Sequence, residues 1–212
     1  GFLIAALFWS VLGLFGSLPL MLTGDAALAP TDAVFESFSG LTTTGSTVLT
    51  DLDDMAPTLL LWRSMLQWVG GIGIIAMGFA VLPFLRVGGI QILRMESSDR
   101  SDKVVPRATQ LSVLLVAIYF GLSFACAVVY WIGGMTIFDA INHAMTTVST
   151  GGFSTHDASF GHFGAGPQWS ATLFMALGSL PFSLYILALR GRPEALLRDS
   201  QVRFFFGLLV AA

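Results

Sequence analysis

Two short runs of small hydroxyl residues and glycine are the part of this sequence best suited to binding an ion. They read TTTGST at residues 42–47 and STGGFST at residues 149–155. Glycine allows backbone conformations that aim successive carbonyl oxygens in one direction, and threonine or serine adds hydroxyl oxygens without bulk. Successive carbonyl oxygens can replace the hydration shell of a monovalent cation. Both runs are therefore candidate ion-coordinating loops.

Each run follows a short apolar segment, at residues 31–41 and 136–148. Segments of this length are too short to cross a bilayer and are typical of re-entrant or interfacial helices. Thr136 and Asp139 form a capping-box pattern that predicts a helix start. The C-terminal end of each short helix would point its negative dipole end toward the polar loop, which favours a cation there.

Longer apolar segments of spanning length lie around these pieces, at residues 1–22, 57–85, 108–133 and 168–189. The chain is 55% hydrophobic and only 11% charged, whereas soluble domains have about 25% charged residues. The predicted fold is an all-α integral membrane protein. The expected organisation is a first repeat (1–86), a cytoplasmic loop (87–107), a second repeat (108–189), and a loop with the start of a third repeat (190–212).

The order of span, short helix, polar loop and span occurs twice, which indicates an internal repeat of about 100 residues. A Phe-Glu pair at residues 35–36 precedes Gly45, and a Phe-Asp pair at residues 138–139 precedes Gly151. On this pattern Glu36 corresponds to Asp139, and Gly45 to Gly151. Because the last residues resemble the start of a further span, and the chain begins with Gly, we expect a fragment of a longer protein.

Basic and acidic residues are separated along the chain. Nine of the ten Lys and Arg lie in the two joining segments: Arg86, Arg94, Arg100, Lys103, Arg107, Arg190, Arg192, Arg198 and Arg203. The other connections carry acids and no Lys or Arg: Asp25, Asp32, Glu36, Asp51, Asp53, Asp54, Asp139 and Asp157. The positive-inside rule places the basic segments in the cytoplasm and the polar loops outside. The acidic rim would concentrate cations near the loops.

Several of these stretches resemble the Trk/Ktr/HKT superfamily of potassium transporters, in particular its TrkH-like membrane subunits. The resemblance rests on GLTTTGST (40–47), LWRSMLQWVGGIGI (61–74), FDAINHAMTTVSTGGFSTHDAS (138–159) and KVVPRA (103–108), and it extends over essentially the whole chain.

The resemblance implies potassium uptake through a channel-like pore in the bacterial inner membrane, with four repeats around one selectivity filter and no covalent chemistry. It implies no cofactor, with potassium as the transported substrate. It also implies a homodimer of full-length chains and a cytosolic, TrkA-like nucleotide-binding regulatory subunit. The matching filter positions are Thr43, Thr44, Gly45, Ser46, Ser149, Thr150, Gly151 and Gly152.

Other polar residues have competing interpretations. Arg63 lies inside a predicted span, and we expect it to pair with an acid such as Glu36 rather than to snorkel. The three histidines lack regular metal-ligand spacing, so we favour structural roles, with His143 bonded behind the filter, over a metal site. Small residues such as Gly70 in the second span indicate close helix packing. The lone Cys126 is expected to be a small buried side chain.

The acids of DLDDM (51–55) are interpreted as a solvated rim, although they also resemble a metal or diphosphate motif. A rival function therefore stays open, namely a membrane-embedded enzyme acting on a lipid diphosphate through these acids and the histidines. Such an enzyme should gather acids and histidines at one mouth. A pore should instead align glycine and threonine carbonyls along one axis.

Overall fold

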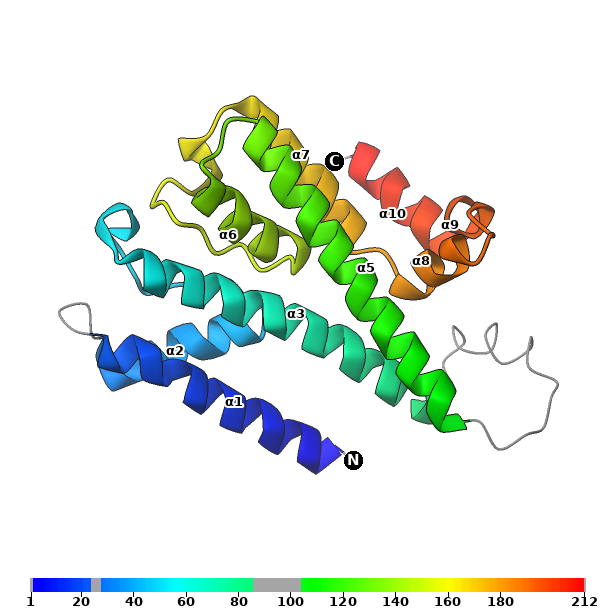
Figure 1. Cartoon of the computed structure of the whole chain (residues 1–212), viewed down its shortest axis with the longest axis horizontal. Coiled ribbons are helices and arrows are strands. Elements are labelled where there is room, and N and C mark those ends of the chain that lie inside the picture. The colour runs from blue at the N-terminus through cyan, green and yellow to red at the C-terminus, as the bar shows by residue number, and fades with distance from the viewer. Residues whose placement is uncertain (1, 24–27, 86–103, 212) are drawn as a thin grey trace. The chain divides into compact units, whose positions relative to one another are not determined.

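The computed structural model describes residues 2–23, 28–85 and 104–211. Within these ranges every regular element is a helix (Figure 1), as predicted. The elements are α1 (Phe2–Leu22), α2 (Pro30–Leu41), η2 (Leu52–Asp54), α3 (Pro57–Leu85), α5 (Val104–Ile132), α6 (Ile137–Val148), η3 (Ser159–His162), α7 (Ala165–Gly178), α8 (Phe182–Leu189), α9 (Glu194–Arg198) and α10 (Ser200–Ala211). Most of the expected cytoplasmic loop at 87–107 lies outside the described residues.

The chain divides into two compact units, which are described separately. The first unit extends to Ile74 and includes Gly121–Gly178, and the second comprises Ile75–Phe120 and Ser179–Ala212. In the second unit Tyr119 of α5 packs against Phe182 of α8, with ring centroids 6.2 Å apart. The short helices and both polar loops belong to the first unit.

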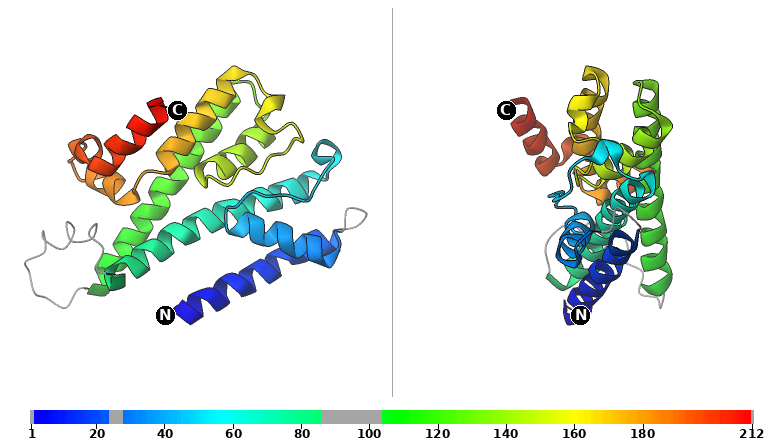
Figure 2. Two further views of the ribbon diagram at one scale, coloured as in Figure 1. Left: turned by 180° about the vertical axis from the view of Figure 1, so that it is seen from behind. Right: turned by 90° about the vertical axis from the view of Figure 1, so that its left-hand side faces the viewer.

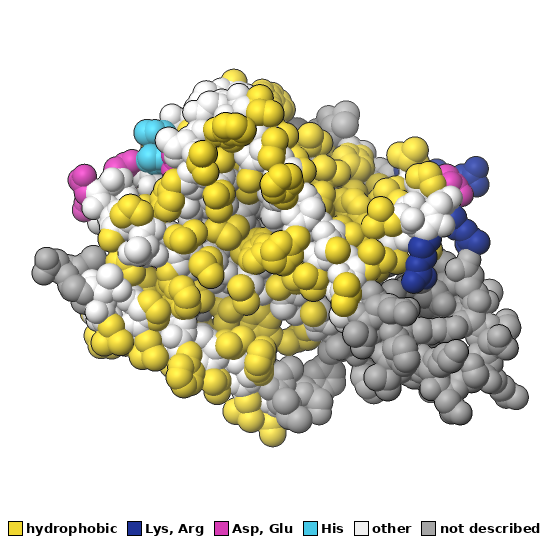
Figure 3. Space-filling model, viewed as in Figure 1, with side chains coloured by type: hydrophobic (Ala, Val, Ile, Leu, Met, Phe, Trp, Pro, Cys, Tyr) yellow, Lys and Arg dark blue, Asp and Glu magenta, His cyan; other side chains and the backbone are white. Residues whose placement is uncertain are grey.

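Two helical segments are long and apolar enough to cross a membrane, judged on the described residues. They are Pro57–Gly78 of α3 and Ser112–Ile132 of α5, while Ala6–Leu22 of α1 is a shorter apolar helix. A third span is counted only when α7 and α8 are taken together. Figure 3 shows hydrophobic side chains over much of the visible face, as expected for a surface in contact with lipid.

The predicted span at 168–189 is not one continuous helix. α7 begins earlier, at Ala165, and ends at Gly178, and α8 starts only at Phe182. Pro181 weakens the helix at this point, although it does not decide the break alone. It has no N–H to donate to a preceding carbonyl, its ring clashes with the residue four positions earlier, and it disfavours helical backbone at Leu180.

The two short helices lie where the sequence places them. Pro30 begins α2 within its first turn, and Thr136 caps α6 by accepting a hydrogen bond from the Asp139 N–H at 3.1 Å. α2 lies against α1 (Figure 2), where the Ser37 hydroxyl donates to the Gly13 carbonyl at 2.7 Å. Capping and hydroxyl bonds thus satisfy polar groups that would otherwise lie unpaired among apolar helices.

The C-terminal end of each short helix packs closely against a glycine of the helix that follows it in the chain. A β-carbon on Gly70 of α3 would stand 2.0 Å from the carbonyl oxygen of Leu41, the last residue of α2. A β-carbon on Gly178 of α7 would stand 2.7 Å from the carbonyl oxygen of Val148, the last residue of α6. The close packing expected at Gly70 is therefore present, and in both repeats a glycine lets the following helix approach the end of the short helix.

Candidate functional site

The first polar loop (42–47) and the second polar loop (149–155) share an unusual backbone conformation. Thr43 and Gly45 have positive φ, at 56° and 77°, and Thr150 and Gly152 have positive φ, at 54° and 86°. The residues between them do not, so the sign of φ alternates along both loops. Non-glycine residues seldom adopt positive φ, and therefore the conformation is a shared and specific feature.

This conformation fixes the register of the repeat, and the register differs from the one predicted. Thr43 corresponds to Thr150, and Gly45 to Gly152, an offset of 107 residues in both cases. The counterpart of 43–46 is therefore 150–153. Ser149 ends α6 as its C-cap, with φ −76°.

The acids were also paired incorrectly. At the observed offset Glu36 corresponds to His143, and Asp139 corresponds to Asp32. The phenylalanine used to align the two repeats is at the start of α6 but in the middle of α2. An alignment on that residue is therefore displaced by a turn of helix.

Backbone N–H groups of both loops turn back toward the short helices. In the first loop Thr43 donates to the Gly40 carbonyl at 2.9 Å, and Thr44 and Gly45 donate to the Ser39 carbonyl at 2.9 and 3.4 Å. In the second loop the matching bonds run from Thr150 to Thr147 at 2.9 Å, and from Gly151 and Gly152 to Thr146 at 2.8 and 3.4 Å.

The carbonyl groups consequently point away from the short helices. The described peptide bonds are all trans, and a trans peptide directs its C=O opposite to its N–H. Among the residues that the structure describes, no hydrogen bond reaches the carbonyl oxygens of Thr43, Thr44, Thr150 or Gly151. Each loop therefore presents a short row of free carbonyl oxygens on one side.

The two loops approach each other through their backbones. A β-carbon on Gly45 would stand 1.8 Å from the carbonyl oxygen of Gly151, and one on Gly151 would stand 2.4 Å from the Gln67 side chain. Gln67 is buried in α3, and its Oε1 accepts a hydrogen bond from the Phe153 N–H at 3.1 Å. Gln67 thus fixes the second loop from the first repeat, a role the sequence analysis did not identify.

A buried ion pair lies behind the first loop, as predicted. The Arg63 Nη2 atom lies 2.7 Å from Glu36 Oε1, and the two side chains are 1% and 0% exposed. Thr47 donates its hydroxyl to Glu36 Oε1 at 2.8 Å, and the Val48 N–H donates to Oε2 at 3.2 Å. A carboxylate with its own hydrogen bonds and a guanidinium partner is a well-satisfied buried charge.

Arg63 also reaches the second loop. Its Nη1 donates to the Ser154 carbonyl at 3.4 Å, and its guanidinium carbon lies 4.3 Å from the centre of the Phe153 ring. This distance is within the range of a cation–π contact. One side chain therefore connects the two loops from behind.

His143 lies behind the second loop and contacts it, as Glu36 does for the first loop. Its Nε2 lies 2.9 Å from the Ser154 hydroxyl, and its Nδ1 lies 2.9 Å from the Asp139 carbonyl oxygen. Ser154 corresponds to Thr47 in the observed register, so equivalent positions make equivalent contacts. The predicted structural role of His143 is present in the fold.

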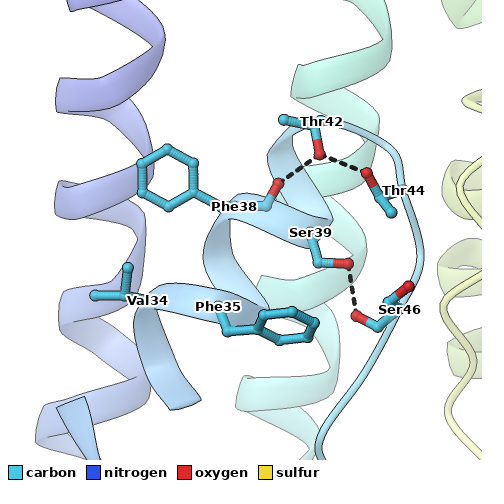
Figure 4. Close-up of a pocket in the computed structure, with 7 residues that line it drawn as sticks. All are labelled: Val34, Phe35, Phe38, Ser39, Thr42, Thr44 and Ser46. Atoms are coloured by element: carbon cyan, nitrogen blue, oxygen red, sulfur yellow. Dashed lines mark hydrogen bonds between the residues drawn. The ribbon is translucent and has the colours of Figure 1, made fainter. Parts of the chain in front are cut away.

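The exposed side of α2 and the first loop forms a shallow pocket of about 370 Å³ (Figure 4). Hydroxyl groups hold the loop on this side. The Thr42 hydroxyl donates to the Phe38 carbonyl at 2.8 Å and lies 2.8 Å from the Thr44 hydroxyl, while the Ser39 hydroxyl donates to the Ser46 carbonyl at 2.5 Å. The loop is therefore tied to the C-terminal turns of its short helix.

The connections that follow the two loops meet through Asp53 and Asp157. The Leu52 N–H donates to Asp157 Oδ2 at 3.0 Å, and the Asp157 N–H donates to Asp53 Oδ2 at 3.3 Å. Asp53 Oδ1 contacts His156 Nδ1. The hydrogen bond with His156 and that from Asp157 hold the pKa of the Asp53 carboxyl below its ordinary value. Asp53 is thus more than part of a solvated rim.

Each of the two expected patterns has a counterpart in the first unit, although alignment of the carbonyls along one axis stays a prediction. Free carbonyl rows line the loops, and Asp53 gathers with His156 and His162 at one end of the unit, where acidic and histidine side chains lie together (Figure 3). Sequence spacing did not reveal this cluster because its members lie in separate loops.

The chain is similar throughout to known cation transporters. A sequence model of the TrkH family, described as a cation transport protein, matches residues 1–211. The chain is 50% identical over 211 residues to the Trk system potassium uptake protein TrkI of Halomonas elongata, covering 99% of this chain and 43% of that protein. It is 44% identical over 213 residues to the Trk system potassium uptake protein TrkH of Escherichia coli K12, covering 98% and 44%.

A solved structure has the same fold. The crystal structure of the potassium transporter TrkH from Vibrio parahaemolyticus matches with a TM-score of 0.89 at 40% identity, covering 100% of this chain and 43% of that chain. The chain therefore spans less than half the length of the relatives it matches.

Proposed function

This chain belongs to the TrkH family of cation transport proteins, and from that premise we propose that it supplies two pore repeats of a potassium uptake protein. The polar loops form part of the selectivity filter, with the carbonyl oxygens of Thr43, Thr44, Thr150 and Gly151 directed toward the ion. The observation that carries the proposal is the set of N–H bonds to α2 and α6, which leaves those carbonyls free.

Potassium is a suitable substrate for this arrangement. A monovalent cation stripped of water is stabilised by several carbonyl dipoles at once, and no side-chain charge is required. The negative dipole ends of α2 and α6 lie next to the loops and add to the attraction. Gly45 and Ser46 in the first loop, with Gly152 in the second, complete the segments that shape the site, and Ser149 caps the helix that precedes the second loop.

Two loops line only part of a ring, and the remainder is assigned to the rest of the full-length protein. Exposed apolar residues on the short helices fit this interpretation, with Phe35 of α2 45% exposed and Ile137 of α6 63% exposed. Such surfaces at the two pore-facing helices would be covered by further repeats. The resemblance to the family adds a homodimer and a TrkA-like nucleotide-binding subunit as partners.

We assign the protein to the bacterial inner membrane, with the polar loops outside and the Arg-containing segments in the cytoplasm. The one-sided Lys and Arg distribution supports this orientation. The rival lipid-diphosphate enzyme is not favoured, because the curated relatives are named as potassium uptake proteins.

The test is potassium uptake by the full-length protein in a bacterial host without its own potassium transport systems. We expect the protein to restore growth at low potassium and to take up K⁺ in preference to Na⁺. A correctly inserted protein that transports neither ion, or does not discriminate between them, would contradict the proposal.

A further inference from the structure

A cluster of metal-ligating side chains lies apart from the carbonyl rows. It comprises Asp53 in η2, His156 in the connection after the second loop, and His162 at the end of η3. One potential ligand atom from each residue lies within 4.8 Å of the others. The His156 and His162 rings are stacked, with centroids 3.7 Å apart and planes within 3°. Three separate loop segments therefore converge on one point.

We propose that Asp53, His156 and His162 bind one divalent transition-metal ion of the Zn²⁺ class. Two imidazoles and one carboxylate are a ligand set that Zn²⁺ accepts, with water in the fourth position, whereas Ca²⁺ and Mg²⁺ prefer oxygen ligands throughout. With ligand bonds of about 2.0–2.2 Å, tetrahedral geometry would place the ligand atoms roughly 3.5 Å apart. Asp53 Oδ1 already contacts His156 Nδ1 and must move away from it to admit the ion. The stacked His162 ring must turn out of its parallel arrangement so that its nitrogen points at the same ion, and both movements involve the exposed side chains of Asp53 and His162.

His156 is already oriented as a metal-binding histidine. Its Nδ1 contacts Asp53, while its Nε2 is buried, lies 3.4 Å from Asp139 Oδ1, and makes no hydrogen bond among the described residues. Metal-bound histidines commonly direct their second ring nitrogen to a carboxylate, which fixes the ring. Asp139 is itself fixed, because the Thr155 hydroxyl donates to Oδ1 at 2.7 Å and the Thr136 hydroxyl to Oδ2 at 2.6 Å.

The metal would connect the two repeats. Asp53 and His156 are 103 residues apart in sequence, and the bonds of Asp157 with Leu52 and Asp53 already hold their segments together. These bonds reduce the loop ordering that metal binding would otherwise require. The bound ion is distinct from the transported one, because its ligands are nitrogen and carboxylate rather than backbone carbonyl.

Titration calorimetry with ZnCl₂ on the purified full-length protein in detergent tests the site directly and does not depend on transport. We expect one Zn²⁺ per chain, and a rise in Kd of about tenfold or more in Asp53→Asn, His156→Gln and His162→Gln. Asp54→Asn is the matched control, because Asp54 shares the η2 turn with Asp53 but lies outside the cluster. It should bind Zn²⁺ like the wild type.

Because His162 is exposed, its replacement should fold even if the other variants fold poorly. Elution volume and melting temperature are measured for each variant to check folding. Two results would overturn the proposal. One is a wild-type Kd for Zn²⁺ weaker than about 100 μM, which would leave only a hydrogen-bonded cluster. The other is equal affinity in the wild type and in well-folded His162→Gln.

Discussion

Gly45 lies against Gly151 so closely that a β-carbon on Gly45 would stand 1.8 Å from the Gly151 carbonyl oxygen. The oxygen belongs to a backbone carbonyl, so it cannot move aside as a flexible side chain would. Gly45 also has φ 77°, which L-residues seldom adopt. Space and conformation therefore both require glycine at this position, where the two polar loops meet.

Four glycines separate the effects of space and conformation on selectivity. Gly45→Ala introduces both a steric clash and backbone strain. Gly151→Ala introduces only a clash, and Gly152→Ala only strain, because its φ is 86°. Gly164→Ala introduces neither. We expect Gly45→Ala to lose most K⁺ preference over Na⁺, the two intermediate variants to lose part of it, and Gly164→Ala to resemble the wild type. Uptake of both ions by the full-length protein in a potassium-transport-deficient host measures the order. Equal behaviour of Gly45→Ala and Gly164→Ala would contradict it.

Pairing of the Glu36 and Arg63 charges should contribute to the stability of the fold, and neither charge should be needed when the other is absent. Glu36→Gln leaves the buried Arg63 charge without its partner, and loss of one partner of a buried pair costs about 3–5 kcal/mol. The double variant Glu36→Gln, Arg63→Met removes both charges and should recover part of that loss. Melting temperatures of purified full-length variants provide the measurement. A double variant less stable than either single variant would show that the pair is not the cause.

This ion pair also shows what the sequence could predict. Arg63 was recognisable because a charged residue within an apolar span needs a partner, and Glu36 was the nearest acid in the neighbouring short helix. The register of the repeat was not recognisable from the same kind of reasoning. The register depends on the positive φ of Thr43 and Thr150. Threonine seldom adopts positive φ, so its presence in the sequence does not indicate this conformation.

The broken span illustrates a second limit of sequence reasoning. The tetrapeptide GSLP occurs at 16–19 and again at 178–181. α1 continues through Pro19, whereas α7 ends at Gly178 and Pro181 precedes α8. Because the same four residues give two outcomes, the decision comes from tertiary packing rather than from local propensity. The Asp53–His156 contact is similarly a product of the fold.

Gly70 and Gly78 offer a matched pair within α3. Gly70→Ala would place a methyl group 2.0 Å from the Leu41 carbonyl oxygen, whereas Gly78→Ala meets nothing within 4 Å. We expect Gly70→Ala to lower stability by about 1–3 kcal/mol or more and to displace the first loop. Gly78→Ala should be neutral or stabilise by up to about 1 kcal/mol, because alanine favours helix. Melting temperature and K⁺ uptake are measured for both variants. Similar values for Gly70→Ala and Gly78→Ala would show that close packing at Gly70 is not required.

The proposed orientation can be tested with single cysteines in a Cys126→Ala background. Cys126 is fully buried, so its replacement removes a thiol of low accessibility. A cysteine replacing the exposed Asp54 should react with a membrane-impermeant maleimide added to intact cells, and one replacing the exposed Arg198 should react only after the cells are opened. Labelling of Arg198→Cys alone in intact cells would reverse the orientation.

The last prediction concerns residues 1–212 by themselves. We expect this chain, reconstituted as a monomer in liposomes, to show no selective K⁺ flux. A dehydrated cation needs oxygen ligands on all sides, and the two loops supply only two rows of carbonyls. The free carbonyls of Thr43 and Thr150 would otherwise face lipid or water, at a cost of several kcal/mol for each unsatisfied group in hydrocarbon. Flux and oligomeric state are recorded on the same preparation, with Gly45→Ala as the control for leakage. Selective flux from a demonstrated monomer would refute the shared-ring argument, whereas flux confined to a dimeric fraction would show that two copies can complete the ring.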